Sequence, residues 1–196
     1  MDLTIVTNSD QDPITTLLWV NHRLCEVFPD WTTQLVTLQN CQLLKIFDNR
    51  TGVEVDLTIN ATLSLWTAEL IRAYGAYNFV AQTAVYLKMW NKAKFPNRTN
   101  RISSHGIVLM LIAYLQSIGV LPCLQKNSSQ QTRIVKVVLI GYQGYIRDRV
   151  NTFFSQSDSS DFVDSKCACG ELLRGFFDFY ASFDFKNRAV DISKDK

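Results

Sequence analysis

Residues 52–60 constrain the fold more than any other stretch. Apolar residues alternate with polar ones from Val53 to Ile59, which is the period of a half-buried β-strand. The opposite face then carries Glu54, Asp56, Thr58 and Asn60. Aspartate is depleted in strands and its charge resists burial. Asp56 therefore either lies at a solvated sheet edge or serves as a ligand.

A second acidic strand at the start of the chain favours the interpretation of Asp56 as a metal ligand. Residues 2–6 read Asp-Leu-Thr-Ile-Val, again a strand pattern. Two aspartates on neighbouring strands of one sheet can hold a divalent cation between oxygen ligands, and such an ion suits phosphoryl or nucleotidyl transfer. Asp2 and Asp56 are the candidate catalytic and metal-binding residues.

Composition gives only a broad indication of the class of protein. The chain has 196 residues, 47% of them hydrophobic, and a net charge of +2, which argues neither for nor against nucleic-acid binding. Its five cysteines lack the spacing of a zinc site. The apolar run Ile107–Leu115 is far shorter than the roughly 20 residues of a membrane-spanning helix, so no membrane association is expected.

The order of elements predicts an α+β fold. A helix over 14–27 follows Asp12, a predicted N-cap, and Pro13 at the first helical position. Strands are predicted over 3–7, 33–38, 43–47, 53–59 and 135–140, the second to fourth forming a meander, and helices over 63–77, 80–95, 103–118 and about 170–183. The change from strands to helices divides the chain into a sheet domain, 1–61, and a mostly helical domain, 62–196.

Six short blocks then occur in an order that resembles a known family. They are Asp56–Asn60, Leu70–Tyr74, Lys88–Lys92, Ser103–Leu111, Val120–Gln125 and Gly170–Tyr180. Together they are similar to the terminal uridylyltransferases and cytoplasmic-type poly(A) polymerases, members of the polymerase-β-like nucleotidyltransferases. The resemblance implies a partial nucleotidyltransferase sheet followed by a helical domain of the poly(A)-polymerase-associated kind.

The resemblance also implies two-metal transfer of UMP from UTP to an RNA 3′ end, with Mg²⁺ or Mn²⁺. Family members carry three carboxylates; Asp56 matches the last and Asp2 the second. The first, and the Gly-Ser turn that precedes it, have no match in the chain, and neither has the family's closing segment. We therefore expect a sequence cut at both ends, whose 196 residues alone are inactive.

Further positions match the family's nucleotide-binding residues. Lys88 and Lys92 lie one helical turn apart; solvated surface lysines are the alternative, but the resemblance implies contact with the β- and γ-phosphates. Ser104, at a predicted helix N-terminus that favours an anion, would join them or simply cap the helix. Three other polar residues, Asn60, Ser64 and Thr67, match base and ribose contacts. His105 stands where family members commonly place a stacking tyrosine, and Thr67-Ala68 replaces their Asn-Thr pair.

Several alternatives remain open. The nucleotide is UTP or, as a poly(A) polymerase, ATP. A non-catalytic scaffold relative in an RNA-processing complex would explain the missing carboxylate, and a protein or antibiotic nucleotidyltransferase would share the sheet but not the later helical blocks. The expected partners are UTP or ATP and an RNA 3′ end, in the cytoplasm or the mitochondrion.

Overall fold

The computed structural model describes residues 1–8, 11–38, 41–125, 134–141, 144–151, 154 and 169–193. The chain forms two compact units. The sheet unit comprises residues 1–67 and 134–150, and the helical unit comprises residues 68–133 and 151–196. The domain division at residue 62 stays a prediction.

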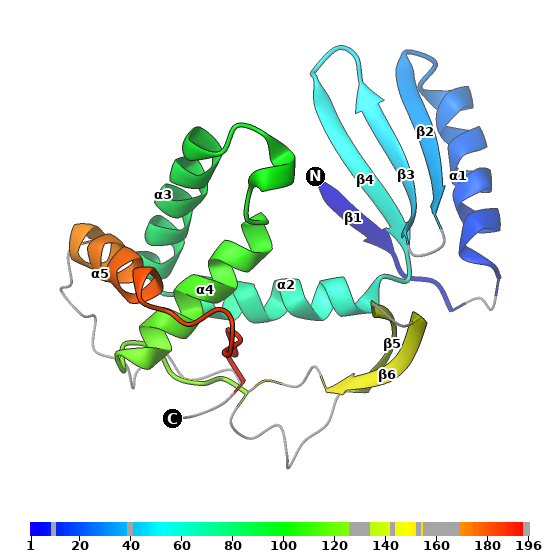
Figure 1. Cartoon of the computed structure of the whole chain (residues 1–196). Coiled ribbons are helices and arrows are strands. Elements are labelled where there is room, and N and C mark those ends of the chain that lie inside the picture. The colour runs from blue at the N-terminus through cyan, green and yellow to red at the C-terminus, as the bar shows by residue number, and fades with distance from the viewer. Residues whose placement is uncertain are drawn as a thin grey trace. The chain divides into compact units, whose positions relative to one another are not determined.

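A four-stranded sheet is the centre of the sheet unit, in the spatial order β1-β4-β3-β2 (Figure 1). Its strands are β1 (Asp2–Ile5), β2 (Trp31–Leu38), β3 (Cys41–Asp48) and β4 (Val53–Ile59). Strands β2, β3 and β4 pair antiparallel, which confirms the predicted meander. Strand β1 lies parallel to β4, so residues from the start of the chain and residues more than fifty positions later are neighbours.

One helix, α1 (Pro13–Val27), covers a face of this sheet (Figure 1). Its start is as predicted, because the Asp12 carboxylate accepts a hydrogen bond from the Thr15 N–H at 3.1 Å and Pro13 occupies the first turn. Leu17 of α1 is fully buried against the sheet. The rest of this core comes from alternate strand positions, Leu44, Ile46, Leu57 and Ile59, which confirms the predicted apolar face. A separate two-stranded sheet, β5 (Ile134–Gly141) and β6 (Gly144–Asn151), includes the strand predicted over 135–140.

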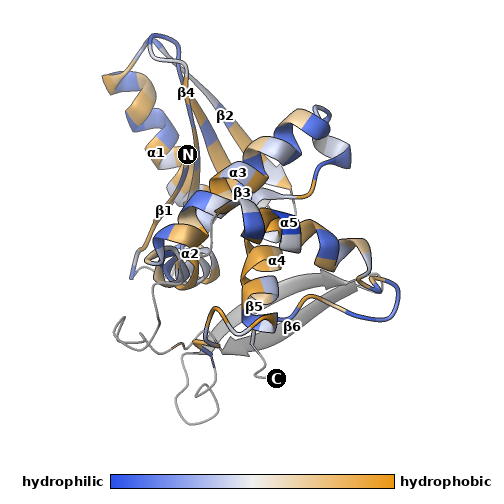
Figure 2. Cartoon of the chain, turned by 90° about the vertical axis from the view of Figure 1, so that its left-hand side faces the viewer, coloured by the Kyte–Doolittle hydropathy of each residue, from blue (hydrophilic) through white to orange (hydrophobic). Residues whose placement is uncertain are grey.

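The helical unit is built from α3 (Asn78–Lys94), α4 (Ser104–Ser117) and α5 (Cys169–Ala181). Helix α2 (Thr62–Gly75) begins in the sheet unit and continues into the helical unit, and a short 3-10 helix, η1 (Arg98–Asn100), precedes α4. All four predicted helices are confirmed, with ends close to those expected. Figure 2 shows apolar residues along much of α4, and six of its residues, Ile107, Val108, Leu111, Ile112, Tyr114 and Leu115, are buried.

Tyr74 links the helical core to the chain segment that follows α4. Its ring is fully buried, and its hydroxyl donates to the Pro122 carbonyl at 3.3 Å and accepts from the Leu124 N–H at 3.1 Å. Burial raises the pKa of Tyr74 to about 12. The hydroxyl is therefore neutral at physiological pH and able to make both bonds. Across the residues that the structure describes, no helix has the length and apolar character needed to cross a membrane.

Candidate active site

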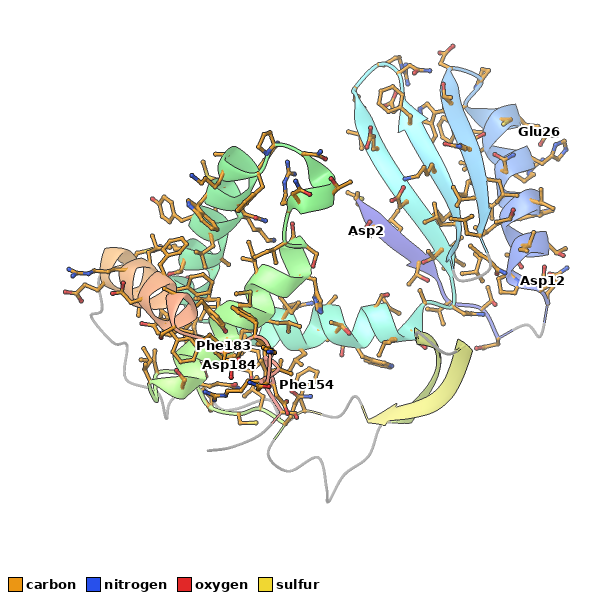
Figure 3. The ribbon with its side chains drawn as sticks, viewed as in Figure 1. Asp2, Asp12, Glu26, Phe154, Phe183 and Asp184 are labelled. Carbon is orange, nitrogen blue, oxygen red and sulfur yellow. The ribbon has the colours of Figure 1, made fainter. Side chains whose placement is uncertain are left out.

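Three charged residues lie side by side on the polar face of the sheet. Asp2 of β1 and Asp56 of β4 are directly paired in the parallel ladder, and Lys45 of β3 is the antiparallel partner of Asp56. Because neighbouring residues at one register level project to the same face, all three side chains point away from α1. Figure 3 shows the Asp2 side chain on β1. Sequence reasoning predicted the two aspartates on one sheet, and the structure places them at the same level.

Lys45 is the residue that sequence reasoning missed. Its Nζ donates to Asp56 at 3.0 Å from Oδ1 and 3.4 Å from Oδ2. Both side chains are partly exposed, 51% for Lys45 and 38% for Asp56, so solvent screens the pair and it contributes about 0.2–1 kcal/mol to stability. The signal was present in the sequence, since Leu44 and Ile46 are both in the apolar core and the residue between them must face the other side.

Whether these side chains can hold a metal ion depends on the ligand atoms that they offer. Asp2 and Asp56 offer four carboxylate oxygens at one level of the sheet, and hard divalent cations take such ligands. The described part of the chain contains no group of three or more His, Cys, Asp or Glu side chains close enough together to hold a metal ion. The pair therefore fits as part of a magnesium site, in which water or substrate oxygens supply the remaining ligands.

Asn60, predicted to contact the nucleotide, connects the ends of β1 and β4. Its backbone is left-handed, with φ 53°, a conformation that asparagine tolerates better than most residues. Its side-chain oxygen accepts from the Thr7 N–H at 2.8 Å, and its amide donates to the Thr7 hydroxyl at 3.1 Å. These bonds hold the two acidic strands in register at their carboxyl ends. The nucleotide contact itself stays a prediction.

The first turns of α2 carry the other two polar candidates of this unit. Ser64 is exposed. Thr67 is partly buried, and its hydroxyl donates to the Leu63 carbonyl one turn earlier, at 2.8 Å. That bond occupies the hydroxyl proton and leaves its lone pairs available as acceptors. Of the two hydroxyls, that of Ser64 is thus the more accessible to solvent.

In the helical unit, Lys88 and Lys92 lie on the exposed side of α3, one turn apart. Neither lysine has a carboxylate partner among the residues that the structure describes. Two ammonium groups on one helix face, with no carboxylate beside them in the part of the chain that the structure describes, favour an anion at that face. The structure thus confirms their shared face, and phosphate contact stays a prediction.

The start of α4 resolves the question of the helix cap. Ser103 is the N-cap, and its hydroxyl accepts from the Gly106 N–H at 3.0 Å. Ser104 is the first helical residue, so the role of cap considered for it was wrong. Ser104 and His105 are both exposed at the end of the helix where the free N–H groups and the dipole favour an anion.

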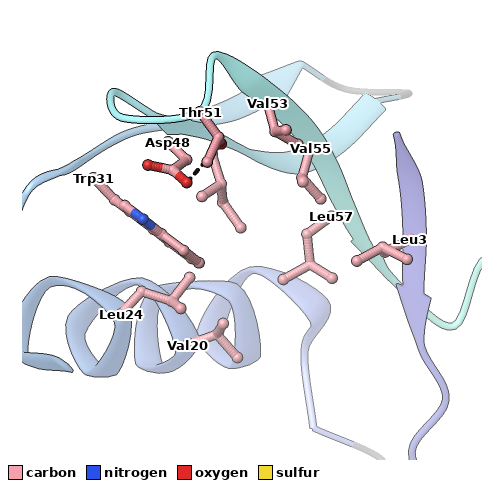
Figure 4. Close-up of a pocket in the computed structure, with 10 residues that line it drawn as sticks. Leu3, Val20, Leu24, Trp31, Asp48, Thr51, Val53, Val55 and Leu57 are labelled. Carbon is pink, nitrogen blue, oxygen red and sulfur yellow. Dashed lines mark hydrogen bonds between the residues drawn. The ribbon is translucent and has the colours of Figure 1, made fainter. Parts of the chain in front are cut away.

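An apolar cavity of about 400 Å³ lies between α1 and the opposite face of the sheet (Figure 4). Leu3, Val20, Leu24 and Leu57 are among the residues that line it, and Asp48 and Thr51 lie at its edge, joined by a hydrogen bond of 2.6 Å. Apolar walls suit neither a triphosphate nor a metal ion. The candidate functional groups of the sheet unit are therefore those of its polar face, and those of the helical unit, taken by itself, are on α3 and at the start of α4.

Comparisons with known proteins show which sequences this chain is similar to. Residues 169–196 match the model of a family described as Cid1 family poly A polymerase. Poly(A) RNA polymerase GLD2 of Rattus norvegicus is 30% identical over 162 residues, covering 79% of this chain and 31% of that protein. Terminal uridylyltransferase 7 of Homo sapiens is 28% identical over 170 residues, covering 81% of this chain and 11% of that protein. The chain thus spans less than a third of either relative.

Solved structures show the same fold over nearly the whole chain. A structure of the Cid1 poly(U) polymerase with magnesium and 3′-dATP matches 99% of this chain and 59% of its own, with a TM-score of 0.76 and 21% identity. GLD-2 in its complex with RNP-8 matches all of this chain and 61% of its own, with a TM-score of 0.74 and 25% identity. The chain therefore carries a domain of the Cid1 family of poly(A) polymerases at residues 169–196, is similar over most of its length to GLD2 poly(A) polymerases and terminal uridylyltransferase 7, and has the polymerase-β-like nucleotidyltransferase fold.

Proposed function

We propose that the protein takes part in template-independent transfer of UMP from UTP to RNA 3′ ends. The observation that supports this most is the direct pairing of Asp2 with Asp56 across the parallel ladder. The register aligns two carboxylates on a solvent-facing sheet surface, where they have no packing role. Family membership supplies the reaction class, and the carboxylates supply the residues.

In this proposal Asp2 and Asp56 hold Mg²⁺ or Mn²⁺. When bound, the ion lowers the pKa of the RNA 3′-hydroxyl and neutralises charge that develops on the α-phosphate. Lys45 pairs with Asp56 at 3.0 Å and reduces repulsion between the two carboxylates before the ion binds. Asn60 keeps the carboxyl ends of β1 and β4 together through Thr7.

The triphosphate is assigned to the helical unit. Lys88 and Lys92 donate to the β- and γ-phosphates, and the N–H groups and the Ser104 hydroxyl at the start of α4 add neutral donors. These groups neutralise the pyrophosphate as it leaves. No histidine is needed as a general base, because the metal supplies that activation.

The base and ribose contacts are assigned to His105, Ser64, Thr67 and Asn60. The imidazole of His105 stacks on the base with less area than a tyrosine would offer. UTP is the proposed nucleotide, and ATP is the alternative, since one relative is named a poly(A) polymerase and another a uridylyltransferase. GLD-2 was solved with RNP-8, and we likewise expect a protein partner in RNA processing.

A non-catalytic member of the family is the second candidate. It is favoured by one observation: among the described residues, only two carboxylates meet on the polar face, and one of them is already paired with Lys45. Such a protein would bind nucleotide or RNA without transferring it. The two proposals differ in metal binding, because a scaffold has no need to bind an ion at Asp2 and Asp56.

The test measures binding of UTP and ATP to the chain by equilibrium dialysis, with and without Mn²⁺. We expect UTP to bind more tightly than ATP, Mn²⁺ to strengthen UTP binding, and inorganic triphosphate to compete. Binding of neither nucleotide would overturn the proposal, and binding without any effect of Mn²⁺ would favour the scaffold. In a parallel assay with labelled UTP and a short RNA, these 196 residues should transfer little or no label, because two carboxylates hold a metal pair poorly.

A further inference from the structure

A buried asparagine lies between the two lysines of α3. Asn91 is 2% exposed, although Lys88 and Lys92 on either side of it are exposed. Within the part of the chain that the structure describes, its side-chain oxygen has no hydrogen-bond partner. An unpaired buried carbonyl oxygen destabilises the folded state, so an apolar residue would serve this position better if packing were its only purpose.

The other half of the amide makes one short, specific bond. Asn91 Nδ2 donates to the Ile102 carbonyl at 2.7 Å. Ile102 directly precedes Ser103, the N-cap of α4. This bond therefore ties the residue before the N-cap of α4 to the turn of α3 that carries both lysines.

The connection between the two helices is also bonded at its α3 end, where the Phe95 N–H donates to the Asn91 carbonyl at 3.0 Å. Arg101 stabilises the connection internally, because its guanidinium donates to the carbonyls of Phe95 and Pro96 at 2.8 and 2.7 Å. Those bonds act on Phe95 and Pro96, at the α3 end of the connection. The bond from the Asn91 side chain acts instead on Ile102, at the α4 end.

We propose that Asn91 is a positioning residue for the triphosphate: it holds the start of α4 against α3, so that the α4 N–H groups and the two lysines act on one anion. The proposal rests on the proposed function of these groups. Asn91 itself does not touch the nucleotide, because it is buried. Its effect is exerted through Ile102 and the cap at Ser103.

Thr83 offers a matched control on the same helix. It is also polar and fully buried, and its hydroxyl lies 3.4 Å from the Cys169 thiol at the start of α5. Thr83→Val removes a buried polar group of α3 without affecting the start of α4. A purely structural contribution of buried polar groups would appear in both variants.

The experiment measures binding of inorganic triphosphate to the full chain by calorimetry at low salt, for the wild type, Asn91→Leu, Thr83→Val, Lys92→Ala and the double variant Asn91→Leu/Lys92→Ala. Thermal unfolding of each variant is recorded alongside. We expect Asn91→Leu to weaken triphosphate binding about threefold to tenfold through misplacement of the donors, and Thr83→Val to leave it unchanged. The double variant should lose less than the sum of the single losses, because both changes act on one site.

The outcomes separate this inference from the function on which it rests. If Lys92→Ala weakens binding and Asn91→Leu does not, the positioning role is wrong and the triphosphate site remains. If Asn91→Leu and Thr83→Val weaken binding equally, or the losses of the double variant are additive, Asn91 acts only on stability. If the wild type binds no triphosphate, the proposed triphosphate site and the positioning role of Asn91 are both wrong. If Asn91→Leu unfolds the chain, Asn91→Ser, which is smaller and carries a hydroxyl in place of the amide, takes its place with the same expectation.

Discussion

The two units present their candidate functional groups in opposite ways. In the sheet unit, Asp2, Asp56 and Lys45 are aligned by the backbone ladder itself, and one carboxylate already has a cation at 3.0 Å. In the helical unit, Lys88 and Lys92 project from one helix without a carboxylate partner among the described residues. The start of α4 is bonded to α3 through a side chain, because the Asn91 amide donates to the Ile102 carbonyl at 2.7 Å.

The difference shows how each element specifies a site. Strand register fixes which side chains are neighbours, so a change outside the register rarely moves them. Helix geometry fixes only neighbours within the helix, and loops and buried polar bonds set the rest. We therefore expect the sheet unit to respond to substitutions of its charged residues, and the helical unit to respond also to substitutions of residues that merely position it.

The largest expected effect tests the sheet unit. Asp56→Ala should weaken Mn²⁺ binding by at least about a hundredfold, because it removes one of two carboxylate ligands. The fold should persist, since the side chain is 38% exposed and pairs only with a half-exposed lysine. Electron paramagnetic resonance of free Mn²⁺ measures the binding, and circular dichroism checks the fold.

Glu54→Ala is the control for that change. Glu54 lies on the same strand and face as Asp56 but pairs with Phe47 in the ladder, away from Asp2. It should leave Mn²⁺ affinity nearly unchanged. Equal losses in the two variants would mean that Mn²⁺ responds to the general charge of this face, and unfolding of Asp56→Ala would give Asp56 a structural role.

The second effect tests the helical unit. Lys92→Ala should weaken UTP binding about tenfold to hundredfold, because an ammonium–phosphate contact contributes about 1–3 kcal/mol. RNA binding should change little, and competition by inorganic triphosphate should weaken in parallel. Lys94→Ala, also exposed on α3 but on another face, should leave UTP binding unchanged. Normal UTP binding with loss of RNA binding would assign Lys92 to the primer.

The same contrast explains what the sequence alone could predict. Alternation from Val53 to Ile59 was enough to place Asp56 on a polar face, and the confirmed meander was predicted from this strand and the two strand-like runs before it. The ion pair to Lys45 required the register between β3 and β4, which periodicity does not provide. Asn91 was hidden for another reason: in a helical pattern between two lysines it resembles a surface residue, whereas the structure shows it only 2% exposed.

The third effect concerns packing of the helical unit alone. A Cβ atom added at Gly175 of α5 would collide with the hydroxyl of Tyr114 on α4. Tyr114 is 6% exposed and packs against Phe176 and Phe179, so its ring has little room to move. Gly175→Ala should therefore lower the free energy of unfolding by about 1–2 kcal/mol, as measured by urea denaturation.

Gly170→Ala on the same helix is the matched control, because an added Cβ there meets nothing within 4 Å. Alanine favours the helix over glycine by up to about 1 kcal/mol, so this variant should be as stable as the wild type or more stable. Mn²⁺ binding should be the same in both variants. Equal stability of the two would show that α4 and α5 can separate without cost.

The smallest effect separates the two roles of Lys45. Lys45→Met should lower stability by about 0.2–1 kcal/mol, as expected for a half-exposed ion pair. It should at the same time strengthen Mn²⁺ binding about threefold to fivefold, because a cation about 3–4 Å from a carboxylate opposes a second cation by about 1 kcal/mol in a watery environment. The two changes have opposite signs, which general damage to the sheet could not produce.

Lys45→Arg keeps the charge and should bind Mn²⁺ as the wild type does. If Lys45→Met instead weakens Mn²⁺ binding, then orientation of Asp56 by the ammonium group outweighs its repulsion, and Lys45 belongs to the metal site as a positioning residue.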